Sequence, residues 1–146
     1  YQPRDDHMSR REEMAVSGSV LSEAPWALAG AAGAVTAVGD MLMHALVWSF
    51  AIGGPLSLGA VVFFAVAGAG ALLRVRRSRA VAWAQRHPWR FAIMPGLACA
   101  AVVFVLSMVV HGGLVGSVFT GLWHGAATTG LTGLVGSVGR PRRARA

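Results

Sequence analysis

Lysine is absent from this sequence, and cysteine and tyrosine occur once each. All 13 basic residues are therefore arginine, against 6 acidic residues, for a formal net charge of +7. The single cysteine, Cys99, excludes an intramolecular disulfide and any metal cluster that needs several thiolates. Because Cys99 lies within an apolar run, we expect it to serve as a small packing residue.

Charged residues of either sign are scarce, at 13% of the 146 residues, whereas 55% are hydrophobic and the mean hydropathy is +0.57. Soluble domains average about 25% charged residues. The long stretches that are almost free of charge indicate a membrane protein. Since the arginines flank these stretches, membrane topology explains the basic charge better than nucleic-acid binding does, and we expect no nucleic-acid partner.

Four apolar stretches are long enough to cross a hydrocarbon core of about 30 Å at about 1.5 Å per residue. Gly53-Gly54-Pro55 separates the first two and His111-Gly112-Gly113 the last two, because glycine and proline disfavour a continuing helix. The sequence thus predicts an all-α integral membrane protein, a four-transmembrane-helix bundle built from two helical hairpins. The bundle is expected over residues 25–139, with spans at about 26–52, 56–73, 91–110 and 114–138.

Three polar segments flank the spans: residues 1–24, 74–90 and 140–146. The first has mixed charges and no sustained apolar period, so we expect a mostly disordered tail. These segments carry every arginine, and the two glycine turns carry none. The positive-inside rule therefore places both termini in the cytoplasm and the turns outside. The arginine-only, alanine-rich usage favours a bacterial chain in the cytoplasmic membrane.

The basic loop over residues 74–90 combines arginine with tryptophan. Arginine attracts anionic lipid, and tryptophan prefers the interface between water and hydrocarbon. We therefore expect a headgroup-contacting segment made of Arg74, Arg76, Arg77, Arg79, Arg86, Arg90, Trp83 and Trp89.

A ridge of small residues follows the fourth span at every fourth position. Transmembrane helices associate where small side chains let their backbones approach. We expect a close helix contact along this ridge, either inside the bundle or with a partner in a homo-oligomer or larger membrane complex. Its members are Ser117, Gly121, Gly125, Thr129, Gly133 and Ser137.

One acidic residue lies deep in the first span. Asp40 shares a helix face with Thr36 and His44, at spacings of four. An aspartate at the bilayer centre costs about 2.5–3.5 kcal/mol on insertion scales, so it usually faces protein or water. Counted inward from the glycine turns, His44 and His124 reach similar depths of about 12–16 Å. With His111 at the outer mouth, these residues trace a polar path to mid-membrane.

Several interpretations of this polar cluster stay open. Asp40 and His44 can satisfy each other and stiffen the bundle. A His and Asp chain can instead relay a proton or hold a cation. His44 and His124 can also ligate haem b or a transition metal, or belong to a quinone site, although we do not favour these cofactors.

Enzyme motifs are absent from the sequence: it has no phosphate-binding glycine loop, nucleophile elbow or His-Glu-x-x-His pattern. We therefore expect a non-enzymatic protein that conducts or transports an ion or proton through the Asp40, His44 and His124 cluster. The alternatives are a non-catalytic subunit or scaffold of a larger membrane complex, and a haem- or quinone-binding anchor of a redox complex.

Overall fold

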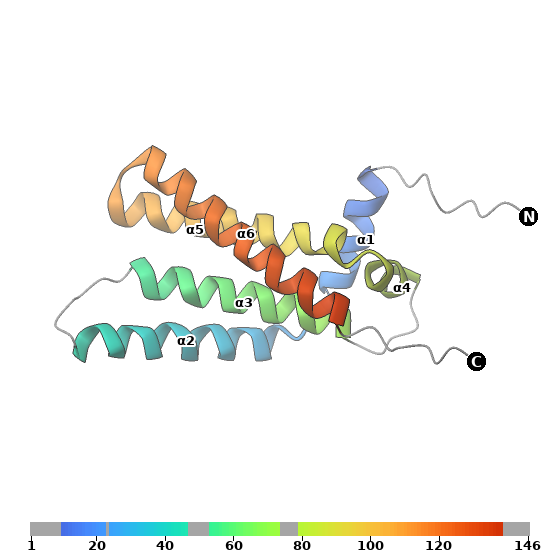
Figure 1. Cartoon of the computed structure of the whole chain (residues 1–146), viewed down its shortest axis with the longest axis horizontal. Helices are drawn as coiled ribbons and strands as arrows, with labels where there is room; N and C mark the ends of the chain where they lie inside the picture. The colour runs from blue at the N-terminus through green and yellow to red at the C-terminus, as the bar shows by residue number, and fades with distance from the viewer. Residues whose placement is uncertain (1–9, 23, 47–52, 74–78, 139–146) are drawn as a thin grey trace, which may run out of the picture.

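The computed structural model describes residues 10–22, 24–46, 53–73 and 79–138. These residues contain six helices and no strand. Four long helices run along the length of the molecule, while α1 and α4 lie together at one end (Figure 1). The helices are α1 (Arg10–Ser22), α2 (Trp26–Leu46), α3 (Gly53–Leu73), α4 (Arg79–Arg86), α5 (Pro88–His111) and α6 (Leu114–Val138).

Three of these helices, α2, α3 and α5, are long and apolar enough to cross a membrane. The chain is accordingly an all-helical membrane protein. Helix α6 has the bounds that the sequence predicts for a fourth span, residues 114–138. It is less apolar than the other three long helices, because glycines, threonines and His124 stand among its apolar side chains.

The helix boundaries differ from the prediction at two prolines. Gly53-Gly54-Pro55 is the first turn of α3 and not a break before it. Helix α5 begins at Pro88, three residues earlier than the predicted span. Proline fits both places because the first N–H groups of a helix have no intrahelical acceptor. The predicted end of the first span, residues 47–52, lies outside the described residues.

Residues 10–22 form α1, although we expected the segment 1–24 to be disordered. Ser17 and Val20, each 2% exposed, face the bundle. Val20 joins a buried cluster that includes Leu72 of α3. The sequence did not reveal this helix because its buried face consists mainly of small residues and its outer face of charged ones.

Helix α4 forms within the segment 74–90 that the sequence predicts to be a loop. Its Val81 is 4% exposed and joins the same buried cluster as α1. Gln85 donates a hydrogen bond of 2.9 Å from Nε2 to the carbonyl oxygen of Leu72. That carbonyl belongs to the last turn of α3, where helix carbonyls lack intrahelical donors, so α4 caps the end of α3.

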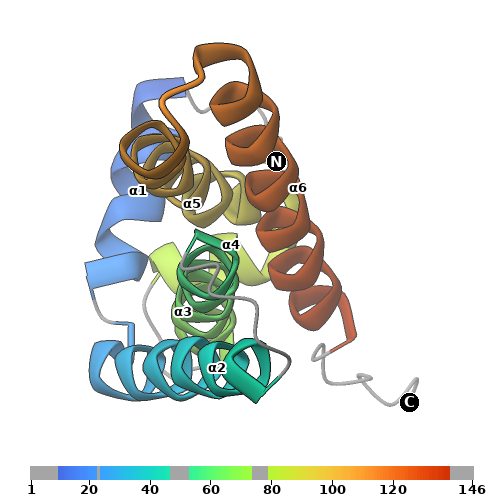
Figure 2. The same cartoon turned by 90° about the vertical axis from the view of Figure 1, so that its left-hand side faces the viewer.

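Helix α3 lies between α2 on one side and α5 and α6 on the other (Figure 2). A β-carbon at Gly33 of α2 would lie 2.8 Å from the carbonyl oxygen of Gly59 on α3. A β-carbon at Gly59 would lie 2.8 Å from Cβ of Ala37. The backbones of α2 and α3 therefore touch at a place where larger side chains do not fit.

The small-residue ridge of α6 lies against α5. A β-carbon at Gly121 would lie 2.8 Å from the carbonyl oxygen of Ala100, and one at Gly125 would lie 2.8 Å from that of Gly96. Thr129 Oγ1 also lies next to Gly96. Since α5 of the same chain occupies this face, the contact that the ridge makes here is inside the bundle.

The two ends of the ridge differ from its middle. Near the start of α6, Ser117 is 1% exposed. Near its end, Gly133 lies under the indole of Trp89, since a β-carbon there would lie 2.5 Å from Cε3 of that ring. Ser137 Oγ donates a 2.8 Å hydrogen bond to the carbonyl of Leu134, within its own helix.

Candidate functional site

A polar pocket of about 330 Å³ lies between α3, α5 and α6. It is at the end of the bundle opposite α1 and α4, where α5 ends and α6 begins (Figure 1). Four hydroxyl side chains and two imidazoles line it, together with glycines from the first turns of α3 and α6. The polar side chains are Ser57, Ser107, His111, Ser117, Thr120 and His124.

Ser117 is the unusual hydroxyl of this pocket. Ser57 Oγ donates to the carbonyl of Gly53 at 2.8 Å, and Thr120 Oγ1 donates to that of Gly116 at 2.9 Å. Ser117 Oγ is buried and has no hydrogen-bond partner among the described residues. A buried polar group without a partner costs about 1–3 kcal/mol. Ser117 is therefore the residue of this lining whose buried hydroxyl is left without a partner among the described residues.

His124 lines the pocket from α6 and is half-buried. Its Nδ1 lies 2.7 Å from the carbonyl oxygen of Thr120. Since a carbonyl only accepts hydrogen bonds, Nδ1 carries the hydrogen. Nε2 is then the acceptor of the neutral ring, and a proton that reaches Nε2 makes the side chain a cation.

His111 is the last residue of α5 and is exposed. Its ring lies against the first residue of α3, because a β-carbon at Gly53 would lie 2.8 Å from Cε1 of His111. Gly112 then ends α5 in the left-handed region, with φ 67°, and donates its N–H to the carbonyl of Met108 at 2.9 Å. Gly112 and Gly113 join α5 directly to α6. His111 at the end of α5 and His124 of α6 therefore line the same pocket.

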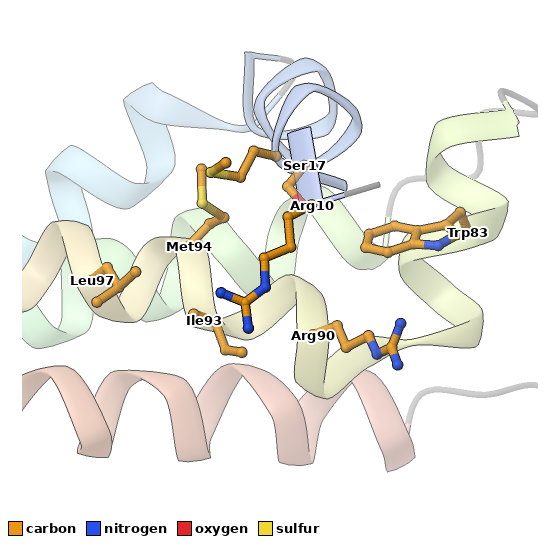
Figure 3. Close-up of a pocket in the computed structure, with 8 residues that line it drawn as sticks. Arg10, Ser17, Trp83, Arg90, Ile93, Met94 and Leu97 are labelled. Carbon is orange, nitrogen blue, oxygen red and sulfur yellow. The ribbon is translucent and has the colours of Figure 1, made fainter. Parts of the chain in front are cut away.

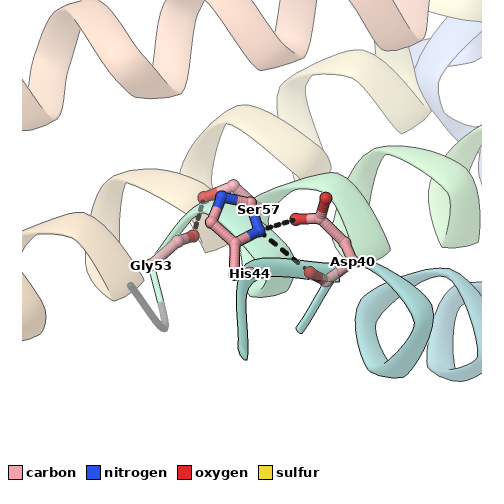
Figure 4. A network of polar contacts seen from close by, with 4 residues as sticks. All are labelled: Asp40, His44, Gly53 and Ser57. Carbon is pink, nitrogen blue, oxygen red and sulfur yellow. Dashed lines mark hydrogen bonds and ion pairs between the residues drawn. The ribbon is translucent and has the colours of Figure 1, made fainter. Parts of the chain in front are cut away.

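Asp40 and His44 form a second polar pair, on α2 (Figure 4). His44 Nδ1 lies 2.9 Å from the backbone oxygen of Asp40 and 3.6 Å from its carboxylate oxygen Oδ2. The side chain of His44 is 37% exposed and that of Asp40 is 27% exposed. Thr36, one turn away, instead donates from Oγ1 to the carbonyl of Ala32 at 2.8 Å. Thr36, Asp40 and His44 therefore share a helix face as predicted, and the polar contact described on this face joins Asp40 to His44.

The structure does not bring Asp40 and His44 into one site with His111 and His124. Helix α2 packs against α3, and the described residues of α2 and α6 make no extensive contact (Figure 2). Asp40 and His44 are not among the residues that line the pocket of His124. His44 and His124 therefore do not line one pocket. No group of three His, Cys, Asp or Glu side chains in the described segments is placed to hold a metal ion.

A packed layer lies inward of His124. The carbonyl oxygen of His124 accepts a 2.9 Å hydrogen bond from Thr128 Oγ1, and Cys99 Sγ lies 3.9 Å from it. Cys99 belongs to a buried cluster with Val61 and Val103. The polar lining of the pocket therefore gives way to apolar packing one turn below the histidine.

The described residues among those expected to contact lipid headgroups lie at the other end of the bundle. Arg74, Arg76 and Arg77 fall outside the described residues, and Arg79 is the first residue of α4. Arg86, Arg90 and Trp89 are exposed, and Trp83 is half-buried on α4.

Sequence reasoning selected His111 and His124 but missed the four hydroxyls that line the pocket with them. It assigned Ser117 to helix packing and gave Ser57, Ser107 and Thr120 no role. A signal was present: Ser107 stands four residues before His111, and Ser117 stands seven before His124, so each serine shares a helix face with a histidine.

Comparison of the chain with known protein families, with curated proteins and with solved structures finds no match. The function is therefore argued from the residues of this chain alone.

Proposed function

We propose that this chain is a four-span membrane protein that takes up a proton, together with a small anion, from the outer side of the cytoplasmic membrane. Helix α6 runs beside α3 and α5, and a two-residue connection joins it to α5 (Figure 1). If α5 crosses the bilayer, α6 then returns across it. The arginines of α1, α4 and the start of α5 belong inside by the positive-inside rule, so the pocket faces outward.

The observation that carries the proposal is the pairing of two imidazoles with an unpartnered buried hydroxyl in one pocket. Imidazole is the side chain whose charge changes between pH 5 and 8. Ionisable groups at membrane depth usually mark the route of an ion or proton. His111 stands at the pocket mouth and His124 three turns into α6, which is the order that inward proton transfer needs.

The lining also favours an anion as the companion of the proton. No carboxylate is among the described residues that line the pocket. Gly53 and Gly54 contribute the first turn of α3, whose N–H groups lack intrahelical acceptors. Protonated His124, these N–H groups and the Ser117 hydroxyl are all hydrogen-bond donors, which suit an ion such as chloride.

Uptake and passage are separate steps in this proposal. Val61 and Val103, which join Cys99 in a buried cluster, stand one helix turn inward of Ser57 and Ser107. In this proposal the pocket is loaded from outside, and transport requires the buried cluster to open.

The proposal is tested by proton uptake into liposomes that contain the purified protein and a pH-sensitive dye. We expect uptake driven by an inward proton gradient and increased by external chloride. His124→Gln should lower it to the level of protein-free liposomes. His87→Gln, outside the pocket, and His44→Gln, on α2, are matched controls that should retain it. Full uptake by His124→Gln would contradict the proposal.

A second candidate function, assembly into a homo-oligomer, is favoured by the exposure of α2. Asp40 and His44 stay partly exposed on a helix that packs mainly against α3. A partly exposed carboxylate is costly in lipid, and a second copy of the chain against the edge of the α2–α3 contact would cover it. In a Cys99→Ala background, Met43→Cys, beside Asp40, should then form disulfide dimers in membranes. Val38→Cys, on the opposite side of α2, should not, and equal amounts from both would contradict assembly through this face.

A further inference from the structure

A second pocket, of about 640 Å³, lies at the arginine-rich end of the bundle between α1, α4 and α5 (Figure 3). Each helix contributes one large polar or amphipathic side chain: Arg10 from α1, Trp83 from α4 and Arg90 from α5. Figure 3 shows the Arg10 side chain extending from α1 toward α5, into the space beside Ile93. The pocket exists only because α1 and α4 pack against the bundle.

The polar part of this pocket is suited to an anion. Arg10 and Arg90 bring two guanidinium groups, and the described lining contains no carboxylate. Guanidinium binds phosphate oxygens through paired, charge-assisted hydrogen bonds. Trp83 adds an indole, the ring that prefers the headgroup level of a bilayer.

The rest of the lining is apolar and continues out of the pocket. Ile93 and Leu97 of α5 line it and are 50% and 61% exposed. The same face of α5 continues at every fourth residue through Ala101 to Val105, which is 57% exposed. A soluble anion gains nothing from this apolar stripe, whereas a hydrocarbon chain lies along it.

We infer that this pocket binds one anionic phospholipid, with its headgroup between Arg10 and Arg90 and an acyl chain along the stripe from Ile93 to Val105. The occupant is a lipid of the inner leaflet, because the arginine end faces the cytoplasm in the proposed topology. Since Arg10 belongs to α1, the bound lipid links α1 to α5. This site is at the opposite end of the bundle from the histidine pocket and does not depend on ion uptake.

The experiment is native mass spectrometry of the full chain in detergent, titrated with dioleoylphosphatidylglycerol or dioleoylphosphatidylcholine. We expect one phosphatidylglycerol to be retained about tenfold more strongly than phosphatidylcholine, because the choline cation of phosphatidylcholine is repelled by the two guanidinium groups, whereas the phosphatidylglycerol headgroup carries a net negative charge. Arg10→Gln and Arg90→Gln should each remove this preference. Arg11→Gln is the matched control, because Arg11 is exposed on the same helix and does not line the pocket.

Three results would overturn the inference. The first is equal retention of the two lipids. The second is an equal loss of the phosphatidylglycerol preference in Arg11→Gln and Arg10→Gln, because that loss would reflect general surface charge. Release of phosphatidylglycerol by inorganic phosphate would assign the site to a free anion. Ile93→Trp keeps both arginines and narrows the apolar part, so it should weaken lipid retention even if Arg10→Gln disturbs the folding of α1.

Discussion

The imidazole of His111 covers Gly53, with Cε1 2.8 Å from the position that a β-carbon at Gly53 would occupy. The end of α5 and the start of α3 thus meet through one ring and one residue without a side chain. The next glycine, Gly54, has open space at the corresponding position. Alanine variants of Gly53 and Gly54 therefore test whether the position of the His111 ring affects proton uptake.

Gly53→Ala should displace the His111 ring and lower proton uptake into liposomes several-fold, because the new methyl group would lie only 2.8 Å from Cε1. Gly54→Ala, which meets no atom within 4 Å, should leave uptake unchanged. Thermal unfolding measured alongside should be similar in both variants, since each places an alanine in the first turn of the same helix. Equal uptake by the two variants would show that the ring position has no role.

Ser117→Ala should raise stability and lower uptake at once. It removes a buried hydroxyl without a partner, which is worth about 1–3 kcal/mol. Thr132→Val is its control, because Thr132 Oγ1 is also buried and unpartnered but does not line the histidine pocket. It should stabilise without changing uptake. Denaturation in detergent and the liposome assay measure the two effects, and normal uptake in Ser117→Ala would remove this hydroxyl from the site.

Gly125→Leu should separate α5 from α6. A β-carbon at Gly125 would lie 2.7 Å from Cβ of Ala100, so a larger side chain overpacks the contact by about 1–3 kcal/mol. Gly130→Leu makes the same change on the same helix where no atom lies within 4 Å. A fall in unfolding temperature is expected only for Gly125→Leu. If both variants unfold alike, the ridge is not the close contact described here.

The proposed orientation is tested with cysteines in a Cys99→Ala background. Gly113→Cys, in the exposed connection between α5 and α6, should react with a membrane-impermeant maleimide added to intact cells. Arg86→Cys, exposed at the end of α4, should react only after the membrane is opened. The reverse pattern would invert the topology and place the histidine pocket inside.

The apolar runs and their glycine turns were enough to predict the bounds of α6 and the extent of α3 within three residues. Apolar length and the glycine after His111 are local properties of the chain, so a sequence shows them. Helix α1 escaped prediction because its Val20 is buried in a cluster with Leu72, a residue distant along the chain.

The candidate site was only partly predictable for a similar reason. Counting residues from a turn indicates how deep His44 and His124 lie, but it does not indicate which helices are neighbours. The glycine contact between Gly33 and Gly59 holds α2 on the face of α3 away from α6, and this separates the two histidines. The repeat of small residues along a helix indicates that it has a close neighbour, but it does not indicate which helix that neighbour is.

The central place of α3 also bears on how a ribosome makes this protein. Helix α2 leaves the translocation machinery before α3 and packs mainly against it, so this hairpin can close before α5 and α6 are synthesised. The glycine contact between α2 and α3 needs no later helix. The opposite side of α3 then remains open to lipid until α5 and α6 are inserted, and a chain that stalls there would present that bare side to membrane quality control.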